Sequence, residues 1–260
     1  MPKIGLVLSG GGYKALAQIG VLKVLDRYKI KVDAAAGCSM GSILGVFYAA
    51  GRTPDEIEDF VIKQSFRSFL DLSMSKLGID KTKRLQRLIE DFARAKRFKD
   101  LKIPMYINAT NISKQREAVF SKGELFQAIR ASVAVPGIFA PVKIKNDYYV
   151  DGGVLNNIPF SILPKNINRY IIIDVIDYGR LSRSKKMSIT NLMEKSIVLM
   201  MEQMTKLRLE EIDKKDYVII KPVLDIRQII PNEKKFRQII REGERAALKK
   251  IPEIRRKFDV

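Results

Sequence analysis

Residues 34–51 constrain the fold of this chain most, because the stretch contains no charged side chain. Its length approaches the ~20 apolar residues that a membrane-spanning helix needs. Four glycines interrupt the stretch, and two of them enclose Ser39 in the sequence Gly37-Cys38-Ser39-Met40-Gly41. Glycines in this arrangement favour a sharp turn between a strand and a helix. We therefore expect a buried strand, a tight turn and a buried helix rather than a membrane span.

Apolar runs of strand length alternate with amphipathic runs of helix length along the rest of the chain. The expected strands are residues 3–8, 32–38, 104–109, 118–120, 148–150, 169–175 and 217–221. The expected helices are residues 13–28, 40–50, 54–63, 81–94, 124–132, 188–212 and 233–256. This alternation is typical of an α/β fold with a mainly parallel sheet and helices on both of its faces. No repeat or low-complexity linker divides the chain, so we expect residues 1–260 to form a single domain.

Two apolar segments carry further expectations. Residues 64–80 have no clear period, so we expect an irregular excursion from the sheet that packs on the fold or forms a lid or acyl-chain wall. Four methionines follow one long expected helix, and we expect them in the core. They are Met193, Met200, Met201 and Met204.

The chain contains one cysteine, Cys38, and no histidine. It cannot form an internal disulfide and offers little for a zinc or iron site, so we expect no metal and no cofactor. The N-terminus enters a strand-like run directly, without the charged lead, apolar stretch and small-residue cleavage site of a signal peptide. We therefore expect a cytoplasmic protein.

The formal net charge of +19 is large enough to attract anionic partners. The basic residues concentrate in two helix-like segments, 81–102 and 234–257. These segments are either solvated helix faces or a docking face for an anionic bilayer at the inner face of a membrane. Nucleic acid is not expected as a partner, because the sequence contains no helix-turn-helix, zinc-finger or RNP-type aromatic motif.

The sequence around Ser39 matches the G-x-S-x-G pattern in which a strained turn exposes a nucleophilic serine. The amides at the start of the following helix would favour the oxyanion that forms when a carbonyl is attacked. The alternative is a tight turn with a structural role only. Cys38 alternates away from Ser39 along the strand, so we interpret it as a small core residue rather than as a nucleophile.

A second glycine-rich sequence, Ser9-Gly10-Gly11-Gly12-Tyr13-Lys14-Ala15, follows the first expected strand. It also matches the G-x-G-x-x-G/A pattern of a dinucleotide site, which requires an acidic residue at the end of the second strand. Asp33 instead stands at the beginning of that strand. We therefore interpret Gly10, Gly11 and Gly12 as an oxyanion loop whose amides face a developing negative charge.

A serine hydroxyl needs a base to become a good nucleophile, and the usual histidine is absent. A carboxylate can serve if it lies within hydrogen-bond reach, ~2.6 to 3.2 Å, and a lysine can serve in a Ser-Lys pair. Carboxylates at or near strand ends and an amine near the glycine loop are the candidates. They are Asp151, Asp174, Asp177 and Lys14. Composition does not choose among them.

Four sequences, in this order along the chain, resemble the patatin-like phospholipase family and specifically its short bacterial members. They are the oxyanion loop at residues 10–14, the elbow at residues 37–41, the A-S-x-A-x-P-x-x-F-x-P-V stretch at residues 131–142 and the D-G-A/G signature at Asp151-Gly152-Gly153. Asn157 and Pro159 follow the last of these as they do in the family. The resemblance extends over residues 3–247, and Ala15 departs from it because many members have a glycine there.

The resemblance implies a three-layer α/β/α fold with a catalytic dyad in a cleft. Ser39 would attack an ester carbonyl, and Asp151 would accept its proton without an intervening histidine. Water would then hydrolyse the acyl-enzyme, and no metal would be needed. The implied substrates are carboxylic esters of phospholipids, lysophospholipids or neutral lipids. The implied motif positions around the dyad are Gly37, Gly41, Gly152, Gly153 and Lys14.

Two hypotheses from other classes accompany this one. The first is a regulatory or adaptor protein that keeps the fold and uses its basic surface to bind a membrane or a protein partner. The second is a nucleotide-binding protein of the Rossmann type. The intact motifs favour the enzyme.

Overall fold

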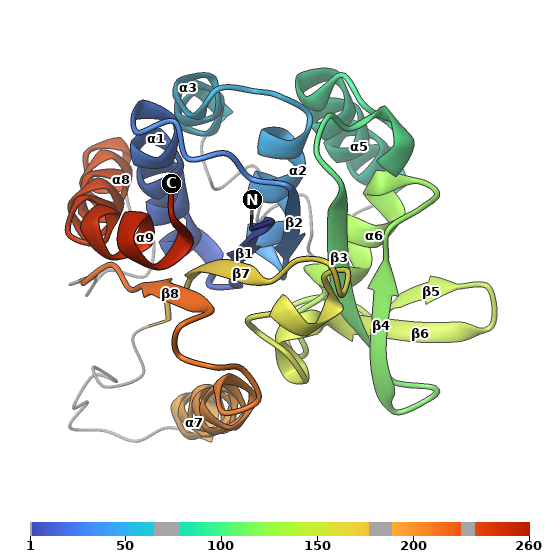
Figure 1. The fold of residues 1–260 in the computed structure, drawn as a ribbon. Coiled ribbons are helices and arrows are strands. Elements are labelled where there is room, and N and C mark those ends of the chain that lie inside the picture. Colours follow the sequence, from blue (N-terminus) through green and yellow to red (C-terminus); the bar gives the residue numbers. More distant parts are fainter. Residues whose placement is uncertain (1, 65–78, 177–188, 225–231) are drawn as a thin grey trace.

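The computed structural model describes residues 2–64, 79–176, 189–224 and 232–260. Within them the chain forms one eight-stranded sheet in the order β5-β6-β3-β2-β1-β7-β8, with β4 also paired to β3 (Figure 1). The strands are β1 (Ile4–Leu8), β2 (Ala34–Gly37), β3 (Met105–Asn111), β4 (Arg116–Phe120), β5 (Val142–Ile144), β6 (Asp147–Asp151), β7 (Arg169–Ile173) and β8 (Tyr217–Ile220).

The sheet consists of a parallel body and an antiparallel wing. In the body, β3, β2, β1, β7 and β8 are parallel to one another. The antiparallel wing is β4, β5 and β6: β4 and β6 pair with β3, and β5 pairs with β6. The body confirms the mainly parallel sheet that the alternation of strands and helices predicts.

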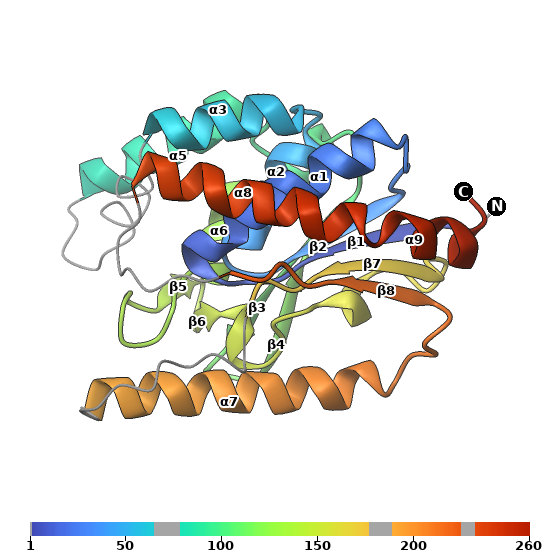
Figure 2. The ribbon, with the colours of Figure 1, turned by 90° about the vertical axis from the view of Figure 1, so that its left-hand side faces the viewer.

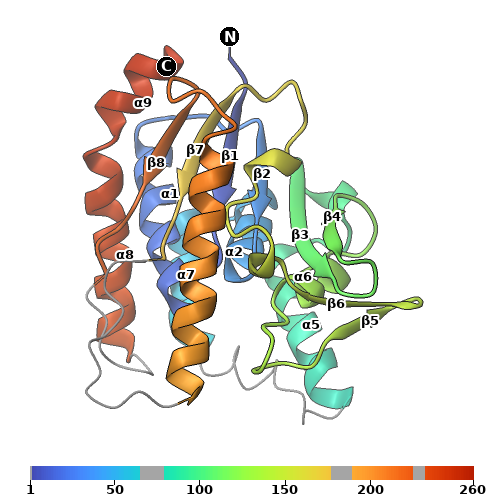
Figure 3. The same cartoon turned by 90° about the horizontal axis from the view of Figure 1, so that it is seen from below.

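Helices cover both faces of this sheet (Figure 2). They are α1 (Ala17–Arg27), α2 (Met40–Ala49), α3 (Pro54–Gln64), α5 (Ile79–Ala93), α6 (Leu125–Ser132), α7 (Ile189–Leu209), α8 (Glu233–Leu248) and α9 (Ile251–Phe258). Of the α-helices that the structure describes, α7 alone lies on the face seen from below in Figure 3. The predicted three-layer α/β/α class is therefore confirmed.

The core lies on both sides of β1, whose five residues are all buried. Leu6 and Leu8 belong to the large apolar cluster that includes α1, α2 and α8, whereas Val7 belongs to a smaller cluster on the opposite face. Successive side chains of a strand point to opposite faces, so β1 contributes to both layers. The apolar run at the N-terminus thus forms the centre of the sheet.

Glycines allow α1 and α8 to cross at close range. A Cβ on Gly20 would collide with the backbone oxygen of Ile240, and a Cβ on Gly243 would collide with that of Ala17. The second basic segment, residues 234–257, therefore packs directly against the core through its apolar face. Its buried residues include Phe236 and Ile239.

Residues 34–51 form β2 and α2, almost all of whose residues are buried, as the glycine pattern predicts. None of the described helices is long and apolar enough to span a membrane. The predicted helix over residues 13–28 begins with a short 3₁₀ turn, Gly12–Leu16, before α1.

Three predictions about helices and segments are not confirmed: two are wrong, and one concerns residues that the structure does not describe. The single helix expected over residues 233–256 is wrong: the chain forms α8 and α9, and Pro252 stands in the first turn of α9, where its missing N–H costs nothing. The core position expected for Met200 is also wrong, because 56% of this residue is exposed. Residues 65–78, the main part of the expected irregular excursion, lie outside the described residues.

Candidate active site

Ser39 lies at the turn between β2 and α2 in a strained backbone conformation, with φ 52° and ψ −129°. Such values are rare for a residue with a side chain, and residues that adopt them cluster at active sites, ligand clamps and switch regions. The flanking glycines make the turn possible. A Cβ on Gly37 would lie 2.7 Å from the Gly41 oxygen, and a Cβ on Gly41 would lie 2.5 Å from the oxygens of both Leu8 and Ser9.

Hydrogen bonds on both sides of Ser39 hold this turn. Its N–H donates to Oγ of Ser132 at 2.8 Å, and Ser132 is the last residue of α6 and fully buried. Its carbonyl oxygen accepts from both the N–H and the Oγ of Ser42, at 2.9 Å and 2.6 Å. Ser132 is a site residue that the sequence places in the proline-containing stretch at residues 131–142 but does not single out.

The register of β3 brings Asp151 to Ser39. Gly37, the end of β2, is opposite Ile107, and Asp151, the end of β6, is opposite Ala109. Because β4 occupies the other edge of β3, β2 and β6 share one edge and run toward each other along it. Two residues of a strand span ~7 Å, so the two chain ends meet there.

Asp151 is a buried carboxylate with one oxygen engaged and one free. Oδ1 accepts the N–H of Gly153 at 2.7 Å and the thiol of Cys38 at 3.7 Å. Oδ2 forms no hydrogen bond with any described residue. Burial raises the pKa of Asp151 to about 6, although the Ser39 hydroxyl, the Gly153 amide and the Cys38 thiol each lower it. The side chain can therefore accept a proton near neutral pH.

The predicted oxyanion loop lies against the elbow, but its three glycines differ. The N–H of Gly10 donates to Oδ1 of Asn157 at 3.1 Å, so it is engaged rather than free. A Cβ on Gly10 would lie 3.0 Å from Cβ of Ser39, which shows how closely the loop approaches the nucleophile. The amides of Gly11 and Gly12 make no hydrogen bond to the described part of the chain. In this arrangement the free donors are thus Gly11 and Gly12.

The other predicted bases are not part of this contact. Asp174 follows β7, and its carboxylate pairs with Lys221 at 3.0 Å and accepts the N–H of Ile176. Burial raises the pKa of Asp174. No ion pair or hydrogen bond connects the Lys14 amine to a described residue, and Asp177 lies outside the described residues. Asp151 is therefore the described candidate that contacts the elbow.

A buried polar layer fixes the turn after Asp151. The Thr110 hydroxyl donates to the Asp151 carbonyl oxygen at 3.0 Å. Asn108 donates to the carbonyl oxygen of Asn156 at 2.7 Å, and both asparagine side chains donate to one oxygen of Glu117. These residues carry no motif signal, because their partners are distant in the sequence.

The described residues contain no group of three or more His, Cys, Asp or Glu side chains that could hold a metal ion. The site instead offers a strained hydroxyl, a carboxylate of raised pKa and free backbone amides. These are the parts that acyl transfer through a serine requires.

Comparison with known proteins places this chain in a family. The family model for patatin-like phospholipases matches residues 6–164, which is more than half of the chain and includes the glycine loop, the elbow and Asp151. The chain belongs to the patatin-like phospholipase family. An NTE family protein of Mycobacterium tuberculosis is 32% identical over 163 residues, which cover 62% of this patatin-like chain and 45% of that protein.

A lysophospholipase, NTE1 of Cryptococcus neoformans, is 32% identical to the patatin-like chain over 185 residues, which cover 68% of this chain and 11% of that protein. The chain thus spans less than half the length of these relatives. Two solved structures share its fold. VipD from Legionella pneumophila has a TM-score of 0.55 at 15% identity. The match covers 96% of this chain and 66% of the VipD chain. ExoU in the complex with SpcU from Pseudomonas aeruginosa has a TM-score of 0.56 at 18% identity. The match covers 100% of this chain and 52% of the ExoU chain.

Proposed function

We propose that this patatin-like chain is a lipid acyl hydrolase that cleaves carboxylic esters through Ser39 and Asp151. The observation that carries the proposal is the free Oδ2 of a buried carboxylate, with a pKa of about 6, beside a serine in a strained elbow. A carboxylate of ordinary pKa is a weak base, and raising the pKa toward neutrality improves it without keeping it protonated at pH 7. Burial of Asp151 therefore replaces the missing histidine.

The proposed reaction has two half-steps. Asp151 takes the proton of Ser39 as Oγ attacks the acyl carbonyl carbon, and the Gly11 and Gly12 amides with the start of α2 stabilise the oxyanion. Collapse of the tetrahedral intermediate expels the alcohol, which receives the proton from Asp151 and leaves an acyl-enzyme. Water then attacks the acyl-enzyme, Asp151 takes its proton, and the second collapse returns that proton to Ser39 and releases a carboxylic acid.

The names of the relatives support the substrate class. Lysophospholipase is the printed activity of the Cryptococcus neoformans relative, and the matching family model is that of patatin-like phospholipases. We extend lipid esters to this chain as part of the proposal, with phospholipids, lysophospholipids and neutral lipids as the class.

Labelling with a fluorophosphonate probe and hydrolysis of p-nitrophenyl esters test the dyad. Ser39→Ala should abolish labelling, and Asp151→Asn should lower kcat by about 10³-fold or more, since the nucleophile loses its base. Asp147→Asn is the matched control: it removes a carboxylate from the same strand, where Asp147 pairs with Lys114 outside the site. Equal labelling of wild type and Ser39→Ala would reject the nucleophile.

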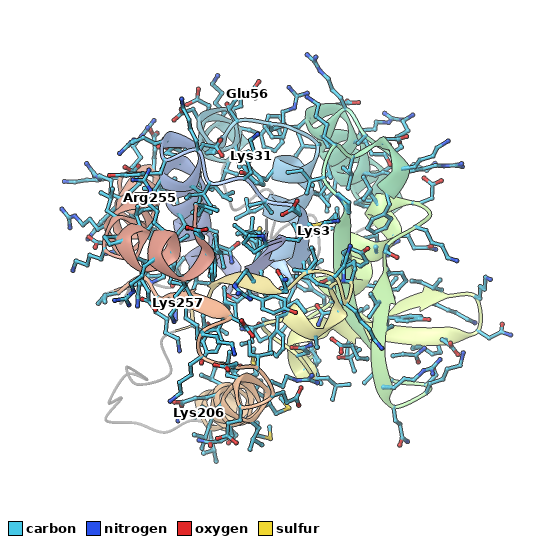
Figure 4. The ribbon with its side chains drawn as sticks, in the orientation of Figure 1. Lys3, Lys31, Glu56, Lys206, Arg255 and Lys257 are labelled. Atoms are coloured by element: carbon cyan, nitrogen blue, oxygen red, sulfur yellow. The ribbon has the colours of Figure 1, made fainter. Side chains whose placement is uncertain are left out.

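We also propose peripheral contact with an anionic membrane, on the basis of the net charge of +19. The labelled basic side chains in Figure 4 come from several parts of the chain, among them Lys206 on α7 and both Arg255 and Lys257 on α9. In the segment 234–257, several cations pair with neighbouring carboxylates; Lys250 and Lys257 share Glu253, which offsets one of their two charges. The charge available for contact is therefore distributed, and a diffuse electrostatic attraction is the form of binding proposed.

A further inference from the structure

Cys38 lies directly before the nucleophile and contacts the proposed base. The residue is fully buried, and its N–H donates to the carbonyl oxygen of Leu8 at 3.0 Å. Its Sγ lies 3.7 Å from Oδ1 of Asp151, a distance at which a thiol forms a hydrogen bond. The interpretation of Cys38 as a core residue describes its burial but not this contact.

The direction of this hydrogen bond follows from chemistry. An ionised carboxylate only accepts, so the thiol must be the donor. Burial and the neighbouring Asp151 raise the pKa of Cys38 well above its usual range, with Glu117 adding to the effect and the backbone of Gly10 opposing it. The side chain is therefore a neutral S–H group.

The carboxylate of Asp151 is thus held asymmetrically. Gly153 and Cys38 both donate to Oδ1, whereas Oδ2 receives nothing from the described residues. Because a carboxylate is planar, two donors at Oδ1 limit rotation of the group and so fix the direction of Oδ2. The Ser39 hydroxyl also lowers the pKa of this carboxylate.

We propose that Cys38 is a positioning residue for Asp151, whose thiol holds Oδ1 so that Oδ2 is free to take the Ser39 proton. The proposal rests on the proposed Ser39–Asp151 dyad. β2 and β6 meet end to end on one edge of β3, so the residue before the nucleophile lies next to the Asp151 carboxylate. The proposal explains why that residue carries a hydrogen-bond donor. The competing account is that Cys38 only fills space.

Two pairs of variants separate a donor from a space-filler. Cys38→Ser keeps a donor in a similar volume, and Cys38→Ala removes it. Cys38→Thr and Cys38→Val have nearly the same shape and differ by a hydroxyl, so they repeat the comparison if the alanine variant does not fold. Circular dichroism and the temperature of unfolding identify the variants that are folded.

The measurement is the pH dependence of kcat/KM on a soluble p-nitrophenyl ester. In wild type, kcat/KM should fall as pH decreases through about 6, where Asp151 becomes protonated. Loss of a donor raises the pKa of the carboxylate, so Cys38→Ala or Cys38→Val should move this fall to higher pH and lower kcat/KM by about three- to tenfold near pH 6. Cys38→Ser or Cys38→Thr should keep the wild-type profile.

A folded Cys38→Ala or Cys38→Val enzyme with the wild-type profile would overturn the inference. Identical losses within a pair would also overturn it, because the defect would then come from packing. The dyad itself fails differently: wild type would be inactive, or Ser39→Ala would retain its activity. The two failures are therefore distinguishable in the same assay.

Discussion

The pKa of Asp151 is the result of opposing influences that can be named. Burial favours the neutral acid, while the nearby Ser39 hydroxyl and the donors from Gly153 and Cys38 favour the carboxylate. A fully satisfied carboxylate would be too weak a base, and a fully desolvated one would stay protonated at neutral pH. The value of about 6 lies between these limits, which is what a base without a histidine partner needs.

This balance makes stability depend on pH in a defined direction. The folded-state pKa of Asp151 lies above its ordinary value of 3.8, so the folded chain holds the proton more tightly than the unfolded chain. The Asp151 side chain therefore contributes favourably to the free energy of unfolding at low pH, and this contribution is lost as pH rises through about 6. Asp151→Asn stays neutral, so it should raise the free energy of unfolding at about pH 8 by ~1 to 3 kcal/mol.

Urea unfolding of wild type and Asp151→Asn at about pH 4 and pH 8 measures this difference. The gain should be smaller at the acidic pH, where wild-type Asp151 is also neutral. A gain that is the same at both values would show that the carboxyl charge is not its source. Asp147→Asn again serves as the control, because the Lys114 and Asn111 side chains lower the pKa of Asp147 and so reverse the sign.

Ser132 offers a second test at the level of one residue. Its Oγ accepts the N–H of Ser39; Ser132 is fully buried and Ser39 is half-buried. Ser132→Ala leaves the half-buried N–H of Ser39 without this partner and should cost ~0.5 to 1.5 kcal/mol of stability, with a further loss of kcat because the elbow is less firmly held. Ser121→Ala, on the exposed surface, should change neither. An unchanged kcat in Ser132→Ala would show that the elbow does not depend on this bond.

At the level of elements, the strand–turn–helix unit β2–α2 depends on glycines at fixed positions. A Cβ on Gly41 would meet the backbone oxygens of Leu8 and Ser9, which cannot move without distorting β1. Gly41→Ala should therefore destabilise the chain by ~2 to 4 kcal/mol and reduce fluorophosphonate labelling. Gly123→Ala introduces a methyl group into open space at φ 88°, so backbone strain of ~1 to 2 kcal/mol is its only cost. Thermal unfolding followed by circular dichroism ranks the two.

The same elements show what the sequence could predict. The buried strand and helix around Ser39 follow from local pattern, and so does the parallel body, because hydrophobic period and glycine position are local signals. The meeting of β2 and β6 on one edge of β3 is not local. Contacts such as Ser132 with Ser39, Asn157 with Gly10 and Cys38 with Asp151 likewise join segments that are distant in the sequence, so no local pattern indicates them.

Two element errors have simpler causes. The break between α8 and α9 follows from Pro252, a signal that is present in the sequence but is masked by continued amphipathic character. Met200 and Met201 are adjacent on α7 but point in different directions. Met200 is exposed, whereas Cε of Met201 would lie 3.2 Å from a Cβ added to Gly153. Apolar composition alone could not show which side of this helix faces the sheet.

At the scale of the whole molecule, the net charge predicts binding that depends on salt. Flotation with vesicles containing anionic lipid should recover the protein at low ionic strength, and recovery should fall several-fold as salt is raised to about 0.5 M, because screening shortens electrostatic attraction. Vesicles of zwitterionic lipid are the control. Binding that is equal on both vesicles and insensitive to salt would contradict the proposed contact.

The end-to-end arrangement of β2 and β6 has a consequence for how the chain acquires activity. Cys38 and Asp151 are 113 positions apart, and they meet only after β3 has paired with both strands. Helices form from local contacts and precede such distant pairings during folding. After dilution from denaturant, helical circular dichroism should therefore recover before fluorophosphonate labelling does. Hydrolytic activity would then report the pairing of β3 with β2 and β6, the last long-range step in forming the sheet. Simultaneous recovery of circular dichroism and labelling would contradict this order.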